Sequence, residues 1–258
     1  MERRSFVKKS TLLAGSALAA GSIKSANVSH VNKDIYELKV YRLSRGYGRD
    51  QLKKYYTNAV IPFLNETGTN VGAFDEYSMD EPPRIYILHA HQSFEAYHTV
   101  IREMQSNKTF LSAAKDYFEL PADKPVFERY ETFLLDAFDS IPHHKVPPKN
   151  RGLFELRTYE SYNEDAGMRK IKMFNEEELP LFEEVGLHPF FFGKILAGQY
   201  MPALTYMLWF RDMDERETNW NKFRISEAWQ KMRVKKEYAD TVSKVHKKFL
   251  VPAEFSQL

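Results

Sequence analysis

Two stretches of the chain share one pattern of apolar and polar positions. The sequences DIYELKVY at 34–41 and GLFELRTY at 152–159 alternate residue by residue and lie 118 positions apart. Strict alternation is the period of a half-buried strand, whose successive side chains point to opposite faces. The pattern therefore predicts two equivalent strands and an internal duplication of the chain.

The two faces of these strands differ in polarity. One face is largely apolar and carries Tyr36, Leu38, Val40 and Phe154, Leu156, Thr158. The other carries an acid, a base and a phenol in each copy, namely Glu37, Lys39, Tyr41 and Glu155, Arg157, Tyr159. Because side chains at i, i+2 and i+4 of a strand share a side, each polar set is expected to project together.

The remaining elements follow the same order in both halves. In the first half we predict a strand at 34–42, a helix within 46–68, strands at 71–77 and 84–91, a helix from Ser93 interrupted near Ser106-Asn107, and a strand at 127–138. In the second we predict a strand at 152–159, a helix over 164–185, strands at 188–196 and 203–211, a second helix, and a strand at 249–253. Each half is thus β-α-β-β-α-β, the ferredoxin-like arrangement.

This order predicts an α+β protein of two tandem ferredoxin-like domains, at 33–139 and 151–258, joined by a proline-bearing linker at 140–150. A four-stranded sheet with helices on one face leaves its other face uncovered. Two copies in one chain can stack these open faces and close an intramolecular dimeric α/β barrel. We expect the polar face, with Glu37, Lys39 and Tyr41 and their counterparts, to point into the lumen.

Residues 1–26 resemble an export signal. Arg3-Arg4-Ser5-Phe6 precedes two lysines and a short apolar run that ends in small residues, a pattern typical of a twin-arginine signal. An ordinary secretory signal is the alternative. Either signal predicts an exported protein, periplasmic or extracellular, with no membrane association after the signal is removed.

Composition excludes several classes of function. The chain has no cysteine, which excludes disulfides, thiol catalysis and cysteine metal sites. Residues 1–26 hold five Lys/Arg and one Asp/Glu, so removing them changes the formal charge from +2 to −2. A nearly neutral mature chain gives no reason to expect nucleic acid as a partner.

The second half resembles the NIPSNAP family of the dimeric α/β-barrel superfamily. FELRTY at 154–159, Leu179-Pro180, YMLWF at 206–210 and SEAWQKM at 226–232 carry the resemblance. The first half is similar but looser, with Lys39-Val40-Tyr41 in place of Arg-Thr-Tyr. The resemblance implies the barrel fold, whereas the superfamily hosts monooxygenases, isomerases, haem enzymes and plain binders.

The duplicated acids and phenols are the candidate catalytic groups. Glu37 and Glu155 could meet in the lumen, where burial would raise one pKa and allow proton transfer. Alternatively, each forms an ion pair with Lys39 or Arg157 on the same face. Tyr159 and Tyr41 could orient a substrate oxygen, or simply pack with a wet hydroxyl.

Two histidines on one strand face raise the question of a metal. His89 and His91 have i, i+2 spacing, which two ligands of one ion can use, while their expected counterparts are Trp209 and Arg211. A third ligand would have to come from Glu37, His98 or His188. Our preferred interpretation has no metal and no cofactor, with His89 as a hydrogen-bonded ligand-contacting residue. Haem is not favoured either, because no single histidine stands out as an axial ligand.

The third strand of the second half offers further ligand contacts. Trp209 would provide a flat apolar surface for a planar ligand. The guanidinium of Arg211 would provide a positive group that can contact a carboxylate with two hydrogen bonds. Core packing and an ion pair with Glu155 are the alternatives. The run at 190–192 is three phenylalanines, and since a strand cannot point all three inward, at least one must meet a helix or a partner subunit. Association into a homo-oligomer is optional, because the duplication within the chain already supplies one pairing of the two sheets.

These observations predict a barrel that binds a small anionic or oxygen-rich organic ligand in its lumen. If the protein is an enzyme, Glu155, Glu37 and Tyr159 would carry acid–base chemistry, while Arg157, Arg211, Trp209, Tyr41, Lys39 and His89 would contact the ligand. The rival hypothesis is a non-catalytic scaffold whose lumen is filled by side chains. An open cavity would favour ligand binding over the scaffold.

Overall fold

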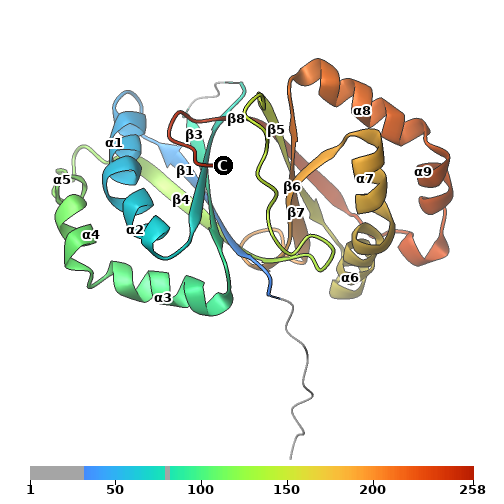
Figure 1. Ribbon diagram of the computed structural model, residues 1–258, viewed down its shortest axis with the longest axis horizontal. Coiled ribbons are helices and arrows are strands. Elements are labelled where there is room, and N and C mark those ends of the chain that lie inside the picture. Colours follow the sequence, from blue (N-terminus) through green and yellow to red (C-terminus); the bar gives the residue numbers. More distant parts are fainter. Residues whose placement is uncertain (1–31, 79–81) are drawn as a thin grey trace, which may run out of the picture. The chain divides into compact units, whose positions relative to one another are not determined.

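The eight strands of the described residues close into one antiparallel barrel. A computed structural model describes residues 32–78 and 82–258 (Figure 1), and the predicted signal at 1–26 lies outside them. The strand order around the barrel is β1-β3-β2-β8-β5-β7-β6-β4. This arrangement confirms the predicted α+β fold with two tandem ferredoxin-like halves.

The elements of the first half match the predicted order, including the break in the second helix. They are β1 (Ile35–Leu43), α1 (Gly48–Tyr55), the π-helical turn η1 (Tyr56–Val60), α2 (Ile61–Glu66), β2 (Asn70–Glu76), β3 (Arg84–His91), α3 (Phe94–Met104), α4 (Lys108–Ala113), α5 (Lys115–Phe118) and β4 (Phe127–Ala137). Ser93 caps α3 by accepting a hydrogen bond from the amide of Ala96, and Asn107 restarts the helix at α4 in the same way.

The second half repeats this order. Its elements are β5 (Leu153–Glu160), α6 (Glu164–Met173), the π-helical turn η2 (Phe174–Glu178), α7 (Leu179–Val185), β6 (His188–Ala197), β7 (Ala203–Phe210), α8 (Met213–Ile225), α9 (Glu227–Met232), the 3₁₀ turn η3 (Lys236–Tyr238) and β8 (Lys244–Pro252). The last strand begins five residues before the predicted start at 249.

The two halves are joined at the edges of their sheets. Strand β2 pairs with β8, where Glu76 lies opposite Leu250, and β4 pairs with β6, where Ala137 lies opposite Gly193. Each half therefore covers both exposed edges of the other. Closure through these pairs makes the lumen a shared interior of the two halves.

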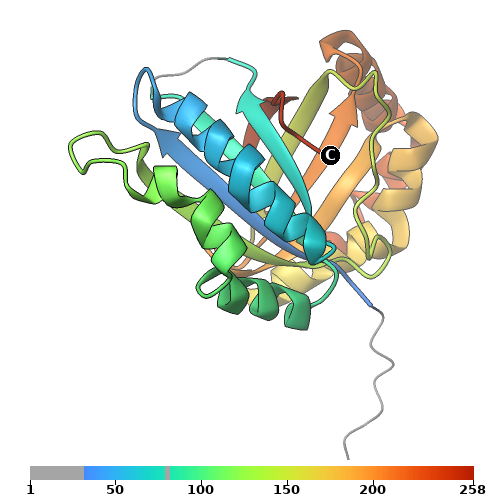
Figure 2. The same cartoon turned by 60° about the vertical axis from the view of Figure 1, so that its left-hand side comes forward.

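The helices form two layers outside the barrel. Helices α1–α5 cover the outer face of the first sheet and α6–α9 that of the second (Figures 1 and 2). Three cores result, one inside the barrel and one beneath each helix layer. Within the described ranges, none of these helices is long and apolar enough to cross a bilayer.

Both halves widen their first helix at the same point. The π-helical turns η1 and η2 directly precede Ile61-Pro62 and Leu179-Pro180. Proline lacks an amide hydrogen, and its ring collides with the carbonyl one turn earlier, so a regular α-helix cannot continue through it undisturbed. A wider turn relieves this collision. The repeat therefore includes a helix distortion as well as the strand pattern.

The strand register corrects one predicted correspondence between the halves. Glu37 lies opposite His89, whereas its counterpart Glu155 lies opposite Leu208. Strands β3 and β7 are thus related by 119 positions, and the counterparts of His89 and His91 are Leu208 and Phe210 rather than Trp209 and Arg211. A shift of one residue reverses the strand face, so the predicted equivalence was wrong.

The three phenylalanines of β6 divide between two cores. Phe190 and Phe191 both lie in the lumen core, and Phe192 lies in the core beneath the second helix layer. The pairing of β6 with β7 shifts between Pro189 and Phe191, an irregularity that places two consecutive side chains on one face. The prediction that at least one of the three meets a helix or a partner subunit is confirmed by Phe192, which meets the helices.

Candidate functional site

The polar strand face that we expected in the lumen lies against the helices. Tyr41 packs with Leu52 and Val60 in the core beneath the first helix layer, and Glu155 bonds to side chains of α8. Because alternate residues of a strand share a face, the whole polar set turns outward: Glu37, Lys39, Tyr41, Glu155, Arg157 and Tyr159. The predicted lumen position of these six residues was wrong.

The alternation itself was correct, and the more apolar face forms the lumen. Tyr36, Leu38, Phe154 and Leu156 belong to the core inside the barrel. Both faces of each sheet are buried, one by the helices and one by the opposite half, so alternation separates the faces without identifying the side of the helices. Charged side chains are tolerated beneath the helices because they find partners there.

Glu155 is fully buried and held by α8. Its carboxylate accepts hydrogen bonds from Arg216 Nε at 2.9 Å and Nη2 at 3.0 Å, and from Trp220 Nε1 at 2.7 Å. The Arg157 guanidinium lies 3.7 Å from the same carboxylate and 4.5 Å from the centre of the Trp220 ring. This set of donors satisfies the charge, as the ion-pair alternative anticipated, although the main partner is Arg216.

Glu37 has different partners. Its carboxylate contacts His89 Nδ1 at 2.9 Å and Lys39 Nζ at 2.6 Å. Burial alone would raise the pKa of Glu37, but the hydrogen bond and charge of His89, together with the charge of Lys39, lower it to about 2. Glu37 is therefore ionised, which is the wrong state for the neutral-pKa proton shuttle that we considered.

The two duplicated phenols pair with other phenols beneath the helices. Tyr41 Oη lies 3.3 Å from Tyr56 Oη, and Tyr159 Oη lies 2.8 Å from Tyr206 Oη. Burial raises the pKa of Tyr41, and it raises that of Tyr159 to about 12. Burial disfavours the charged form of Arg157, but the adjacent Tyr206, Tyr159 and Glu155 outweigh it and raise its pKa.

Trp209 and Arg211, which we predicted to contact one ligand together, lie in different surroundings. Trp209 does face the interior of the barrel, where it packs against the lumen core and stacks on His188 with ring centres 4.2 Å apart. Arg211 lies beyond the end of β7, is exposed, and pairs with Asp212 at 2.9 Å. The ion pair between Arg211 and Glu155, which was the alternative to ligand binding, is absent from the ion pairs of the described residues.

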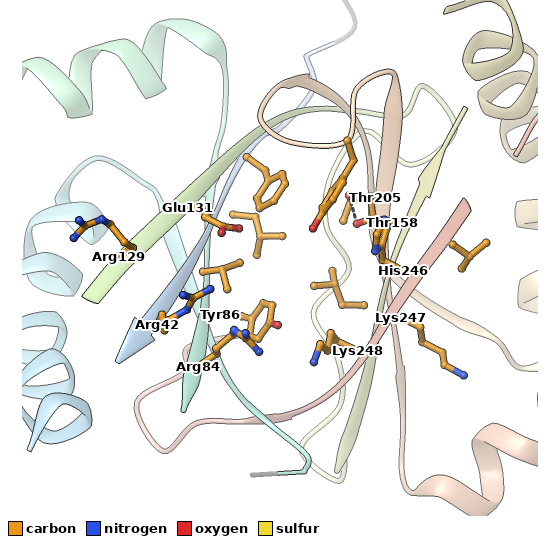
Figure 3. A pocket seen from close by; sticks show the side chains of 16 residues that line it. Arg42, Arg84, Tyr86, Arg129, Glu131, Thr158, Thr205, His246, Lys247 and Lys248 are labelled. Atoms are coloured by element: carbon orange, nitrogen blue, oxygen red, sulfur yellow. Dashed lines mark hydrogen bonds between the residues drawn. The ribbon is translucent and has the colours of Figure 1, made fainter. Parts of the chain in front are cut away.

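One end of the lumen is an open cavity of about 730 Å³. Its walls are apolar or weakly polar and include Leu38, Val40, Phe133, Leu156, Thr158, Tyr200 and Thr205. Its rim carries the charged and polar residues Arg42, Arg84, Tyr86, Arg129, Glu131, His246, Lys247 and Lys248. In Figure 3, Arg42, Arg84 and Lys248 point toward the space beside Tyr86, whereas Arg129 turns away at the edge.

The sequence analysis did not identify the rim residues, although the sequence contains a pattern that marks them. The apolar lumen face of β1 continues from Leu38 and Val40 into Arg42 at the same spacing of two. The lumen faces of three other strands change from apolar to charged or polar in the same way. The change occurs at Arg84 on β3, at Glu131 and Arg129 on β4, and at Lys248 and His246 on β8. The register brings Arg42 opposite both Arg84 and Arg129. Only the register reveals that these changes occur at one end of the barrel.

Glu76 balances part of this positive charge. Its buried carboxylate accepts a hydrogen bond from Tyr86 Oη at 3.1 Å and lies 3.2 Å from Lys248 Nζ and 3.6 Å from Arg84 Nη1. Across the cavity, His246 Nε2 pairs with Glu160, and its ring stacks on Tyr200 with centres 4.3 Å apart. The rim thus combines several cations with few acids.

The other end of the lumen is filled. Phe74, Phe154 and Phe190 pack together there, with ring centres of Phe74 and Phe154 4.8 Å apart. The C-terminal residue Leu258 is buried in the same core. The lumen is therefore open at the end with the charged rim and packed with side chains at the other end.

Comparisons with known proteins agree with this architecture. The NIPSNAP family model matches residues 154–257, and no curated protein matches the chain. A protein of Lactobacillus acidophilus provisionally named a monooxygenase is 10% identical with a TM-score of 0.58, covering 85% of this chain and 94% of its own. A similarly named protein of Fusobacterium nucleatum is 10% identical with a TM-score of 0.54, covering 86% and 93%.

The NIPSNAP match is confined to one half. A NIPSNAP family protein of Agrobacterium tumefaciens is 17% identical with a TM-score of 0.37, covering 41% of this chain and 97% of its own. The matched range begins in β5 and extends past β8, so it includes all strands and helices of the second half. The second half is therefore the part of the chain that resembles the NIPSNAP family, where its motifs indicated the resemblance.

Proposed function

We propose that this chain binds a small organic anion with an apolar body in the open end of its barrel. The observation that carries the proposal is the cavity of about 730 Å³ with apolar walls beneath a rim of Arg42, Arg84 and Lys248. A volume of this size suits a ligand of drug-like dimensions. Arginine at the rim suits a carboxylate or a similar oxyanion, which it can contact with two parallel hydrogen bonds.

The apolar walls and the cationic rim would make different contributions to binding. Removing the apolar body from water would supply most of the affinity, in proportion to the area buried. The rim would orient the ligand with its anionic group toward the mouth. The open cavity also favours ligand binding over the scaffold hypothesis, which required a lumen filled by side chains.

The acid–base roles that we predicted for Glu37, Glu155 and Tyr159 are not part of this proposal, because their side chains point away from the lumen. Any proton transfer to a lumen ligand would fall to groups that line the cavity, such as His246 beside Tyr200. The monooxygenase names of two structural neighbours do not extend the proposal, since a fold shared at 10% identity hosts many chemistries.

A matched pair of fluorescent probes tests the proposal. Anilinonaphthalene sulfonate and N-phenyl-1-naphthylamine share an aromatic body, and only the first carries an anionic group. We expect the charged probe to bind more tightly, and Arg42→Gln and Arg84→Gln each to weaken it about threefold to tenfold, because a charge-assisted contact at a partly exposed site is worth about 1 kcal/mol. Binding of the neutral probe should change little.

Two further variants locate the binding. Val40→Trp should fill the cavity and abolish binding of both probes, since Val40 lies on its wall. Arg211→Gln removes an arginine that lies outside the lining of the cavity and serves as the matched charge control. Equal loss of the charged probe in Arg211→Gln and Arg42→Gln, or full binding in a folded Val40→Trp variant, would refute the proposal.

We also propose export through the twin-arginine pathway, which rests on Arg3-Arg4-Ser5-Phe6 and the apolar run behind it. Replacing both arginines by lysine should stop export by this route while leaving an ordinary secretory signal functional. Export can be followed by fractionation of cells that produce the full chain. Undiminished export of the double lysine variant would favour the secretory alternative.

A further inference from the structure

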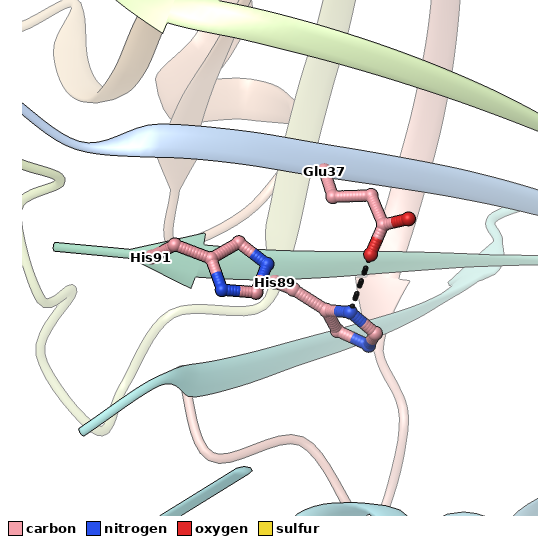
Figure 4. A group of neighbouring side chains, drawn as sticks. All are labelled: Glu37, His89 and His91. Atoms are coloured by element: carbon pink, nitrogen blue, oxygen red, sulfur yellow. Dashed lines mark hydrogen bonds and ion pairs between the residues drawn. The ribbon is translucent and has the colours of Figure 1, made fainter. Parts of the chain in front are cut away.

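A compact cluster of metal-ligating side chains lies beneath the first helix layer, away from the lumen. Glu37 on β1 faces His89 on the adjacent β3, and His91 follows on the same face (Figure 4). One ligand atom from each of the three residues lies within 4.8 Å of the others. All three side chains are at least nine-tenths buried. The cluster is independent of the cavity described above.

The two imidazoles are incompletely paired in this buried position. Nε2 of His89 and Nε2 of His91 are buried without a hydrogen-bond partner among the described residues. His91 Nδ1 lies 3.2 Å from Thr69 Oγ1, which orients the ring and leaves Nε2 free to coordinate. A hydrogen-bond partner on the other ring nitrogen fixes the orientation of a metal-ligating histidine. Unpaired buried polar atoms are costly and therefore need an explanation.

We propose that Glu37, His89 and His91 bind one divalent transition-metal ion. Two imidazole nitrogens and one carboxylate oxygen suit Zn²⁺, Fe²⁺, Co²⁺ or Mn²⁺. Bonds of about 2.0–2.2 Å would place the ligand atoms roughly 3–4 Å from one another, a spacing that side chains whose ligand atoms all lie within 4.8 Å can reach by small movements. Three protein ligands leave a further coordination position for water.

Lys39 acts as a competitor for the carboxylate of Glu37. Its ammonium lies 2.6 Å from Glu37 Oε1, where it supplies positive charge to the cluster. The Lys39 side chain keeps 16% of its surface exposed, so it can turn toward solvent when an ion takes its place. Removing this charge should therefore strengthen metal binding, because the ion would no longer displace or repel an ammonium group.

The second half provides an internal comparison. Leu208 and Phe210 replace the two histidines, and the carboxylate of Glu155 is already occupied by Arg216 and Trp220. The duplicated fold thus holds the ligand set in one half, which predicts one ion per chain. The same comparison supplies a substitution that fits the fold, namely His91→Phe.

The test titrates Co²⁺ into the chelator-stripped full chain. We expect one bound ion per chain by elemental analysis, a visible absorption band from cobalt, and displacement by Zn²⁺. Saturation at about a hundred times Kd should raise the melting temperature by roughly 5–10 °C, since an ion bound only to the folded state stabilises it. Failure of the unsubstituted chain to bind an ion would overturn the proposal.

Three variants assign the ion to these residues. His91→Phe should weaken Co²⁺ binding at least tenfold, Lys39→Gln should strengthen it severalfold, and the double variant His143→Gln, His144→Gln should leave it unchanged. The last pair controls for the imidazoles of the linker, which contact Asp34. A gain in Lys39→Gln cannot arise from misfolding, and circular dichroism checks the other variants. Unchanged affinity in His91→Phe, loss in the linker variant, or weaker binding in Lys39→Gln would each contradict the assignment.

Discussion

Glu37 and Glu155 occupy equivalent positions of a duplicated strand, yet their surroundings differ. Glu155 accepts three hydrogen bonds from two side chains of α8, Arg216 and Trp220. Glu37 instead contacts His89 on the neighbouring strand and Lys39 on its own. Glu155 is thus held by donors that are fixed in one helix, whereas Glu37 is held by a histidine of the neighbouring strand and by a lysine that can turn toward solvent.

The difference shows how a duplicated acid can acquire two roles. A buried charge must be neutralised in either half, and the position of the carboxylate alone does not determine its partner. In the second half the partner is the permanent cation Arg216 and the neighbouring strand positions are apolar, so no ligand atoms remain to bind an ion. In the first half the neighbouring strand positions are histidines, whose ring nitrogens can still bind one. Substitutions at corresponding positions can test this contrast.

The largest effect is expected for Glu155→Gln. Neutralising this carboxylate removes the buried counter-charge of Arg216 and leaves it only the exposed Glu217, and breaking one side of a buried ion pair costs about 3–5 kcal/mol. Urea unfolding followed by circular dichroism measures the loss. Glu217→Gln is the control, because Glu217 contacts the same guanidinium from an exposed position and should cost less than about 0.5 kcal/mol.

A smaller loss is expected for Glu37→Gln in chelator-treated protein, about 1–2 kcal/mol by the same measurement. Lys39 keeps part of its surface exposed and can turn toward solvent, so it is not left as a trapped charge. The contrast between the halves would be broken if Glu37→Gln destabilised the chain as much as Glu155→Gln.

Asp34, at the junction of the halves, should give an intermediate and pH-dependent effect. Its carboxylate accepts hydrogen bonds from His143 and His144 of the linker. Burial raises the pKa of Asp34, but the hydrogen bonds from His144 and His143 outweigh it and lower the pKa below its ordinary value of 3.8. A lowered folded pKa means that the ionised carboxylate stabilises the fold above about pH 4, and that this contribution is lost as pH falls through the folded pKa.

We therefore expect Asp34→Asn to cost about 1 kcal/mol at pH 7 and progressively less than that below about pH 4. Unfolding of both proteins across pH 2–7 measures the difference. Asp139→Asn, at an exposed site that contacts Lys33, should show little effect at any pH. A penalty that persists at pH 2 would rule out the carboxylate charge as its source.

The smallest effect is expected at Arg211. The sequence repeat aligned this residue with His91, but the strand register places it beyond β7 in an exposed pair with Asp212. Arg211→Gln should change the unfolding free energy by less than about 0.5 kcal/mol, as is usual for surface ion pairs. A larger loss would indicate that the one-residue correction of the repeat is mistaken.

Much of the fold could be predicted from the sequence because it depends on local patterns. Alternation identified both copies of the first strand, and the match of Ile61-Pro62 with Leu179-Pro180 placed the first helices in register. Strand β3 was predicted with its observed bounds, 84–91. The halves also had to meet, since each would otherwise expose an apolar sheet face to water.

Tertiary structure alone decided which face of each strand lines the barrel. An alternating strand buried on both sides presents two defined faces, and no local pattern says which one the helices cover. Pairing decided the rest: it brought Arg42 beside Arg84 and Arg129 around one mouth, and His89 beside Glu37. The sequence by itself determined the repeated units and their elements, while the site depends on long-range register, which joins residues that have no local relation to one another.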